Sequence, residues 1–196
     1  MMRRPLPLAA ILLLVALPAH AQIVNPLTAI GKLVTTAADA RTTAEVKDDV
    51  SIATDANKRL IDDKDAEWKG VSLLVFAQRV VIAGAVKSDA AKKRVAELVK
   101  QDKRIRSLVN ELIVIKQAGD DGSMVGDKVI EEKINAALTT TTGVGSINMR
   151  WKAVNGHLVI MGAARSKEEA ELAVKQARAV SGVKSLKSHL RVVAAK

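Results

Sequence analysis

The fold of this chain is decided by the stretch Asn155-Gly156-His157-Leu158-Val159-Ile160-Met161-Gly162 and by Ser166 just after it. Asparagine followed by glycine is a strong signal for a tight β-hairpin turn, because both residue types tolerate positive φ. The apolar run that follows predicts a buried strand, which ends at the second glycine. Ser166, with Glu169 three residues later, predicts a capping box at the start of a helix.

The chain carries this pattern twice, at a constant offset of 78 positions and without a gap. Gly84 matches Gly162, and Ser88 matches Ser166. Further matched pairs are Ile52 with Ile130, Asn57 with Asn135, Leu60 with Leu138, and Leu112 with Leu190. A solenoid unit is usually shorter and occurs in more copies. The repeat therefore predicts two tandem small domains, each with its own core.

Apolar residues spaced three to four positions apart predict a helix at the start of each copy. In the first copy they are Ile52, Ala56 and Leu60, after a candidate N-cap at Asp48 or Asp49. In the second copy they are Ile130, Ile134, Ala137 and Leu138, after Asp127. Residues of type Asp are favoured at helix N-termini.

Alternation of apolar and polar residues predicts the strands that follow. Ile147, Met149, Trp151 and Ala153 point one way in the second copy, whereas in the first copy Leu74 and Phe76 disturb the alternation. After the second helix, Gly182 fits a left-handed C-cap, and Arg104 stands at the matching place in the first copy. A strand–helix–strand connection makes the last two strands parallel. The predicted fold class is α+β: two αββαβ modules, each a three-stranded mixed sheet with two helices on one face.

The chain divides into five parts by composition. Residues 1–21 are predicted to be an export signal, with basic Arg3 and Arg4, a short apolar stretch and a cleavage pattern at Ala19-His20-Ala21. Residues 22–48 are predicted to be a leader and residues 116–126, which contain a glycine- and aspartate-rich cluster, a linker. The two modules occupy residues 49–115 and 127–196.

Cysteine usage and charge limit the class of protein. The chain has no cysteine, which excludes disulfides, thiolate metal sites and a cysteine nucleophile. An exported protein of this size without cysteine is typical of the bacterial periplasm. The full chain has a formal net charge of +10, which falls to +8 without Arg3 and Arg4. A basic excess favours polyanionic partners, although it also serves solubility alone.

The ordered and duplicated motifs resemble the BON domain, a bacterial module. They are Val80-Val81-Ile82-Ala83-Gly84 with Ser88, the stretch from Asn155 to Gly162 with Ser166, Ser181-Gly182-Val183-Lys184-Ser185-Leu186, and Asn110-Glu111-Leu112. The resemblance covers about residues 45–195. With an export signal and a leader motif at Asp39-Ala40-Arg41-Thr42-Thr43, the layout is similar to that of the dual-BON periplasmic proteins.

That resemblance implies association with phospholipid and maintenance of envelope integrity under stress. The chain differs from lipoprotein members of the family because it lacks the cysteine that would carry a lipid, and this difference favours a soluble, reversibly bound protein. The expected partner is therefore an anionic phospholipid membrane surface, bound reversibly. Envelope proteins are an alternative partner, with a chaperone-like or protein-interaction module as the alternative function.

The second module concentrates the basic residues expected to meet such a surface. Each basic group near an anionic membrane contributes about 1 kcal/mol of attraction. The candidate lipid-binding residues are Lys128, Val129, Lys133, Lys175, Arg178, Lys184, Lys187 and Arg191. The candidate structural glycines are Gly84, Gly162, Gly156 and Gly182. Whether the basic residues share one face is not decided by the sequence.

No motif predicts catalysis, a cofactor or a metal site. His157 and His189 stand without a recognisable nucleophile or orienting acid. The cluster Asp120-Asp121-Gly122-Ser123 lacks the spaced oxygen ligands of a calcium loop. Nucleic acid is not an expected partner, because single-strand binding needs aromatic platforms and this chain has only three aromatic residues of types Phe and Trp.

Overall fold

The computed structural model describes residues 38–193. The predicted export signal (residues 1–21) and the first part of the predicted leader, up to residue 37, lie outside the described residues. The first module consists of α1 Thr43–Asp62, β1 Val71–Phe76, β2 Arg79–Val86, α2 Asp89–Lys100, β3 Ser107–Asn110 and β4 Ile113–Val114. The second consists of α3 Met124–Thr140, the short 3₁₀ helix η2 Ser146–Asn148, β5 Met149–Val154, β6 His157–Ala164, α4 Lys167–Arg178 and β7 Ser185–Val192.

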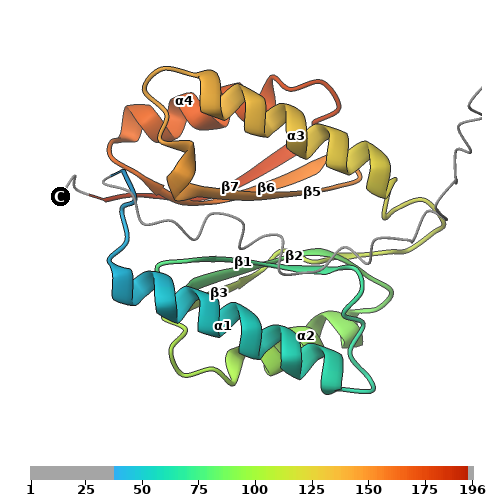
Figure 1. The fold of residues 1–196 in the computed structure, drawn as a ribbon. Coiled ribbons are helices and arrows are strands. Elements are labelled where there is room, and N and C mark those ends of the chain that lie inside the picture. The colour runs from blue at the N-terminus through green and yellow to red at the C-terminus, as the bar shows by residue number, and fades with distance from the viewer. Residues whose placement is uncertain (1–37, 194–196) are drawn as a thin grey trace, which may run out of the picture.

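Each module has the predicted mixed sheet. β1 pairs antiparallel with β2, and β3 and β4 both pair parallel with β2. In the second module β5 pairs antiparallel with β6, which pairs parallel with β7. Both helices of a module cover the same face of its sheet (Figure 1). The α+β class and the two tandem αββαβ modules are thus confirmed.

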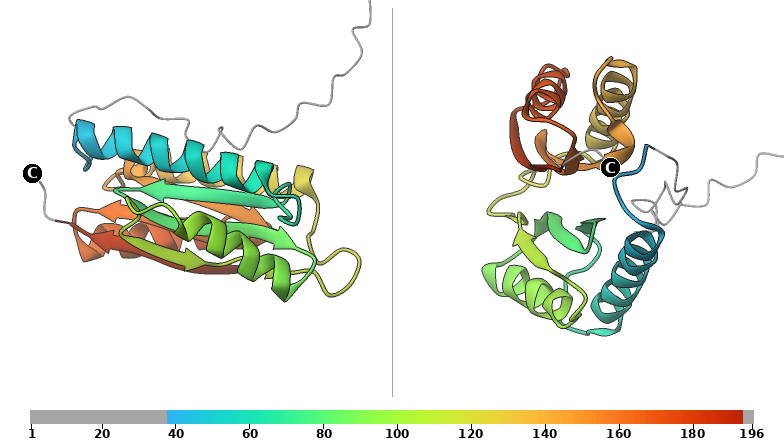
Figure 2. Two further views of the ribbon diagram at one scale, coloured as in Figure 1. Left: turned by 90° about the horizontal axis from the view of Figure 1, so that it is seen from below. Right: turned by 90° about the vertical axis from the view of Figure 1, so that its left-hand side faces the viewer.

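The two sheets lie face to face, and the four helices form the outer layers (Figures 1 and 2). Each module has its own core between sheet and helices. A third buried cluster, which we call the seam, joins the inner faces of the two sheets and contains Leu74, Phe76, Val81, Ala83, Val159, Met161 and Ala163. The seam explains why Leu74 and Phe76 disturb the alternation in β1: they face the other module rather than solvent.

Both predicted N-caps were wrong. The cap of α1 is Thr42, which forms a capping box with Glu45, so the helix begins inside the segment predicted as leader. The cap of α3 is Ser123, whose side chain accepts a hydrogen bond from the Gly126 amide. Asp49 and Asp127 lie in the first two turns of these helices and are buried.

Those two aspartates hold the hairpins. The Asp127 carboxylate accepts hydrogen bonds from the amides of Asn155 and Gly156 at 2.8 and 2.9 Å. Asp49 accepts from Ala77 and Gln78 at 2.8 and 2.6 Å. The predicted tight turn at Asn155-Gly156 is present, with φ of 48° and 74°. Each helix is thereby fastened to the hairpin of its own module.

Three smaller features differ from the predicted ones. The closing strand of the first module is divided into β3 and β4, and Asn110 Oδ1 accepts a hydrogen bond from the Leu112 amide at the break. The turn at Arg104 is built by Asp102, whose carboxylate accepts from the Arg104 amide and guanidinium. The capping box at Ser166 is only half formed, because the Glu169 carboxylate accepts from Gly145 and Arg165 instead.

Candidate functional site

One end of the second module brings together three segments that are distant in the sequence. The start of α3 is fixed to the 155–156 hairpin by Asp127. The turn after α4 lies against both, since a Cβ on Gly182 would be 2.9 Å from Ile130 and a Cβ on Gly156 would be 2.5 Å from the Gly182 carbonyl oxygen. Lys184 Nζ donates to Asn155 Oδ1 at 2.7 Å. We call this region the hairpin end of the second module.

Large apolar side chains are exposed at the hairpin end. Met124 is 82% exposed, Val125 75% and Val129 42%. They make up three of the five exposed large hydrophobic residues found within residues 38–193. All three lie in the first two turns of α3, and their exposure separates them from the buried core residues Ile130 and Ile134 of the same helix. An apolar group of this kind on a small protein commonly marks an interaction surface.

Exposed cations lie on the elements that meet at the hairpin end. Lys128 and Lys133 are exposed on α3, Lys175 and Arg178 on the last turns of α4, and Lys184 in the turn that follows. Of the neighbouring acids, Asp127 is buried beneath the hairpin. Glu131 is paired with Lys152 at 3.0 Å and also accepts the Ala153 amide at 2.9 Å. The exposed face of α3 therefore carries more basic than acidic charge, although Glu132 is exposed beside Lys128.

Lys187 and Arg191 do not belong to this surface. In β7, Leu186 and Leu190 pack against the core of the second module, so the residues next to them point to the opposite face of the sheet. Lys187 forms an ion pair with Glu111 of the first module at 2.6 Å. His189 Nε2 lies 3.0 Å from the other oxygen of the same carboxylate. The eight candidate residues thus fall on two sides of the module: six of them lie on the helix side and two face the first module.

Burial and hydrogen bonding act in opposite directions on Glu111. Burial raises the pKa of its carboxyl, whereas the hydrogen bonds from Lys187 and His189 lower it, and the net direction is downward. Glu111 therefore carries its negative charge between the modules. Lys187 uses its charge within the protein, and His189 contacts the same carboxylate, which separates both residues from the exposed cations of α3 and α4.

In the described part of the chain, neither His157 nor His189 belongs to a recognisable catalytic group. His157 Nδ1 lies 2.7 Å from Ser185 Oγ on the exposed surface. His189 Nε2 contacts the Glu111 carboxylate. Within residues 38–193 there is no group of three His, Asp or Glu side chains arranged to hold a metal ion. No helix in that same range is long and apolar enough to cross a membrane.

Sequence reasoning missed two features of this region. Met124 and Val125 lie at the end of the segment predicted as a linker, residues 116–126, in which α3 already begins, and they were not recognised as exposed. The carboxylates that hold the hairpins were mistaken for caps. Their spacing offered a signal, because Asp49 and Asp127 stand 78 positions apart, as do the two turns that they bind. A repeated acid opposite a repeated turn indicates a shared contact.

Comparison with known proteins supports the duplication. A BON-domain model matches residues 48–116 and again residues 126–194. A protein of Anaplasma centrale described as an uncharacterised protein in the gshII 5' region is 26% identical over 145 residues, which are 74% of this chain and 95% of that protein. The osmotically inducible protein Y of Escherichia coli (strain K12) is 25% identical over 147 residues, 74% of this chain and 72% of that protein.

Similarity to solved structures is weaker. Two structures of CdsD, a structural protein of the type III secretion system of Chlamydia trachomatis, are each 16% identical and have TM-scores of 0.32 and 0.30. They cover 76% and 71% of this chain, which in turn spans 65% and 64% of their lengths. The two family matches together extend over most of the sequence. The chain therefore belongs to the BON-domain family and carries two copies of the domain.

Proposed function

We propose that this chain is a non-enzymatic, exported protein of the periplasm that binds anionic phospholipid surfaces reversibly through the hairpin end of its second module. The observation that carries the proposal is that the exposed apolar residues Met124, Val125 and Val129 share the hairpin end with exposed cations of α3, of the last turn of α4 and of the turn after it. Apolar side chains that enter a membrane interface and cations that meet anionic headgroups are the two components of reversible peripheral binding.

A role in envelope integrity under stress is part of this proposal. It is supported by the predicted export signal and by the similarity to an osmotically inducible protein. The exposed apolar residues alone are too few for stable anchoring, since stable attachment usually needs two independent signals. Binding that depends on both apolar contact and charge is therefore expected to be weak, reversible and sensitive to salt.

Flotation with liposomes tests the proposal. The wild-type protein is expected to float with vesicles rich in anionic lipid at low salt, and less so as salt rises. Each lost cation costs about 1 kcal/mol of attraction, so replacing Lys128, Lys175 and Lys184 by Gln should weaken binding by about two orders of magnitude. The triple variant Met124→Ser, Val125→Ser and Val129→Ser should lose flotation without a change in helix content.

A matched control comes from the first module. Ile61 is 50% exposed and Lys58 lies one turn before it on α1, so Ile61→Ser with Lys58→Gln removes an exposed apolar side chain and a charge from the other module. This control should float like the wild type. If the wild-type protein does not float with anionic vesicles at low salt, the proposed lipid role is wrong. Salt-independent co-purification with envelope proteins would instead support the protein-interaction module.

A further inference from the structure

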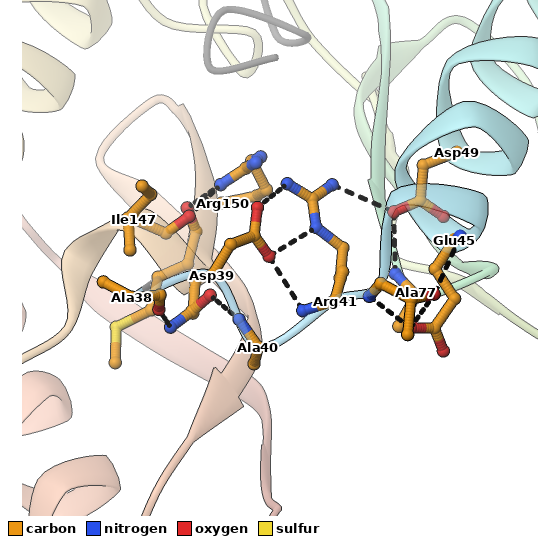
Figure 3. A network of polar contacts seen from close by, with 12 residues as sticks. Ala38, Asp39, Ala40, Arg41, Glu45, Asp49, Ala77, Ile147 and Arg150 are labelled. Carbon is orange, nitrogen blue, oxygen red and sulfur yellow. Dashed lines mark hydrogen bonds and ion pairs between the residues drawn. The ribbon is translucent and has the colours of Figure 1, made fainter. Parts of the chain in front are cut away.

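The segment Ala38–Arg41 crosses between the two modules as a bent stretch without helix or strand (Figure 3). The side chain of Asn148, which is 4% exposed in the second module, binds the backbone of this segment on both sides of Asp39. Asn148 Oδ1 accepts the Ala40 amide and Asn148 Nδ2 donates to the Ala38 carbonyl, both at 2.8 Å. One side-chain amide thus satisfies a donor and an acceptor of the peptide, as a neighbouring strand would.

The side chains of the same segment bind the first module. Arg41 donates to both oxygens of Asp39, at 3.1 and 2.8 Å, and to Asp49 at 3.0 Å. All three charged side chains are at most 4% exposed. Asp49 also holds the 77–78 hairpin of the first module. The segment is therefore fixed to the second module by its backbone and to the first by its arginine.

An aromatic side chain completes the surroundings. The guanidinium of Arg41 lies 4.6 Å from the centroid of the Phe76 ring, and that of Arg150 in β5 lies 5.6 Å from it. Burial, and then the positive charge of Arg41, lower the pKa of Arg150 to about 10, and Asp39 acts against this shift. Two arginines and two aspartates thus meet at the seam, one of each belonging to the segment.

A segment that only connects other parts of the chain does not need buried ion pairs and hydrogen bonds of this kind. Burying charged side chains carries a large desolvation cost, which is offset only by well-formed ion pairs and hydrogen bonds. A loop that merely connects α1 to the residues before it could remain solvated at no such cost. The contacts are specific for a peptide backbone that carries an acid and an arginine two positions apart, as expected of a bound peptide.

We propose that Asn148, Phe76, Asp49 and Arg150 form a binding site for a short peptide with an Asp-x-Arg core, that the chain's own residues 38–41 fill this site, and that filling it holds the two modules face to face. The site is distinct from the proposed lipid surface at the hairpin end. Its occupant in this chain is the end of the leader, and the same segment supplied by another molecule is the expected substitute.

Energy transfer between two dyes tests whether the segment holds the modules. The chain has no cysteine, so Glu97→Cys on α2 and Glu171→Cys on α4 give two exposed labelling sites in opposite outer layers. The double variant Asp39→Ala with Arg41→Ala should lower the transfer efficiency because the modules separate. Asn148→Ala, which removes only the two backbone contacts on the second module, should lower it as well. Circular dichroism should show unchanged helix content in both variants.

A matched control removes an ion pair elsewhere. Lys58 and Asp62 form a pair on α1 with side chains 72% and 60% exposed, and replacing both by Ala should leave the transfer efficiency unchanged. If both the 39/41 double variant and Asn148→Ala keep the wild-type transfer efficiency, the proposal is overturned.

A synthetic peptide of residues 36–45 tests the site itself. A tethered segment has an effective concentration in the millimolar range, so the peptide is added at millimolar concentration to the 39/41 double variant. It should restore the transfer efficiency, whereas a scrambled peptide and a triple variant that also carries Asn148→Ala should show no recovery. Failure of the peptide to restore it, or equal recovery with the scrambled peptide, contradicts the binding site. No membrane is present, so the result is independent of the lipid proposal.

Discussion

The hairpin turn of the first module has two unfavourable features at Gln78 that the matching turn of the second module lacks. Gln78 stands at the position that Gly156 fills in the second module and has a φ of 62°, a left-handed conformation that is unfavourable for a side chain. Its Oε1 atom is the one buried side-chain oxygen or nitrogen within residues 38–193 that has no hydrogen-bond partner. Both features are costs that the second copy avoids by using glycine.

Gln78→Gly is therefore expected to stabilise the protein by about 1 kcal/mol, through relief of the left-handed strain and loss of the unsatisfied oxygen. Urea unfolding would measure the change in the free energy of unfolding. The reverse change, Gly156→Gln, should be strongly destabilising, since a Cβ there would lie 2.5 Å from the Gly182 carbonyl oxygen. A destabilising Gln78→Gly would show that the hydrogen bond from Gln78 to Asp48 outweighs the strain.

The Asp102 carboxyl makes the free energy of unfolding depend on pH. Hydrogen bonding to the Arg104 guanidinium, against the opposing effect of burial, lowers the pKa of Asp102 from 3.8 to about 2. Because the folded state favours the carboxylate, this stabilisation is complete above about pH 4 and is lost as the pH falls towards 2. It amounts to about 2 kcal/mol at neutral pH.

Asp102→Asn should remove that pH-dependent part. The difference in free energy of unfolding between wild type and variant should shrink as the pH falls from 4 to 2, as measured by urea unfolding at each pH. Asp62→Asn is the control, because that side chain is 60% exposed and should show only a small difference throughout. A constant difference for Asp102→Asn would show that the Arg104 contact does not act through charge.

At the scale of elements, β6 depends on a glycine for its close approach to β5. Gly162 has a φ of 135°, and a Cβ on it would lie 2.0 Å from the Asn148 carbonyl oxygen. Gly162→Ala should therefore cost about 3 kcal/mol or more in the free energy of unfolding. Gly126→Ala in α3 has no atom closer than 3.6 Å and should gain about 0.5 kcal/mol, as is usual for alanine in a helix. Equal effects of the two changes would contradict this account.

The elements themselves could be predicted because their signals are local. Periodicity located the helices, and Asn155-Gly156 located the second hairpin. The start of α1 was missed although Thr42 and Glu45 have the spacing of a capping box. The predicted role of Lys187 and Arg191 ignored the alternation of β7, in which Leu186 and Leu190 already occupy the helix side. The exposed Met124 and Val125 could not be recognised, because apolar residues at a helix start are as typical of a core.

At the scale of the whole molecule, the seam couples the modules. The sequence showed that both faces of β2 are apolar, from Val80 to Ala83, but it could not show what covers the second face. Met161 in the seam and Met149 in the core of the second module are both 1% exposed. Either Met→Ala change should cost about 2–5 kcal/mol. Only Met161→Ala should also weaken the contact between modules.

Trp68 lies in the first module and Trp151 in the second. Two reporter proteins are made, in each of which one of these tryptophans is replaced by Phe, so that fluorescence follows the unfolding of one module at a time. We expect coincident urea transitions for the wild type and for Met149→Ala, but separated transitions for Met161→Ala, since coincident transitions indicate cooperative unfolding. Coincident transitions in all three proteins would show that contacts other than Met161 maintain the coupling. Separate transitions in the wild type would contradict the seam as a cooperative interface.

The seam also resembles a subunit interface enclosed within one chain. Val81 and Ala83 of β2 correspond, at the offset of 78, to Val159 and Met161 of β6, and all four meet there. Self-complementary contact between equivalent patches is the hallmark of twofold dimers. A lone half of this protein would expose its apolar inner face and should pair with another half, which suggests that gene fusion joined the subunits of an ancestral homodimer into one chain, in which the contact between the halves no longer depends on concentration.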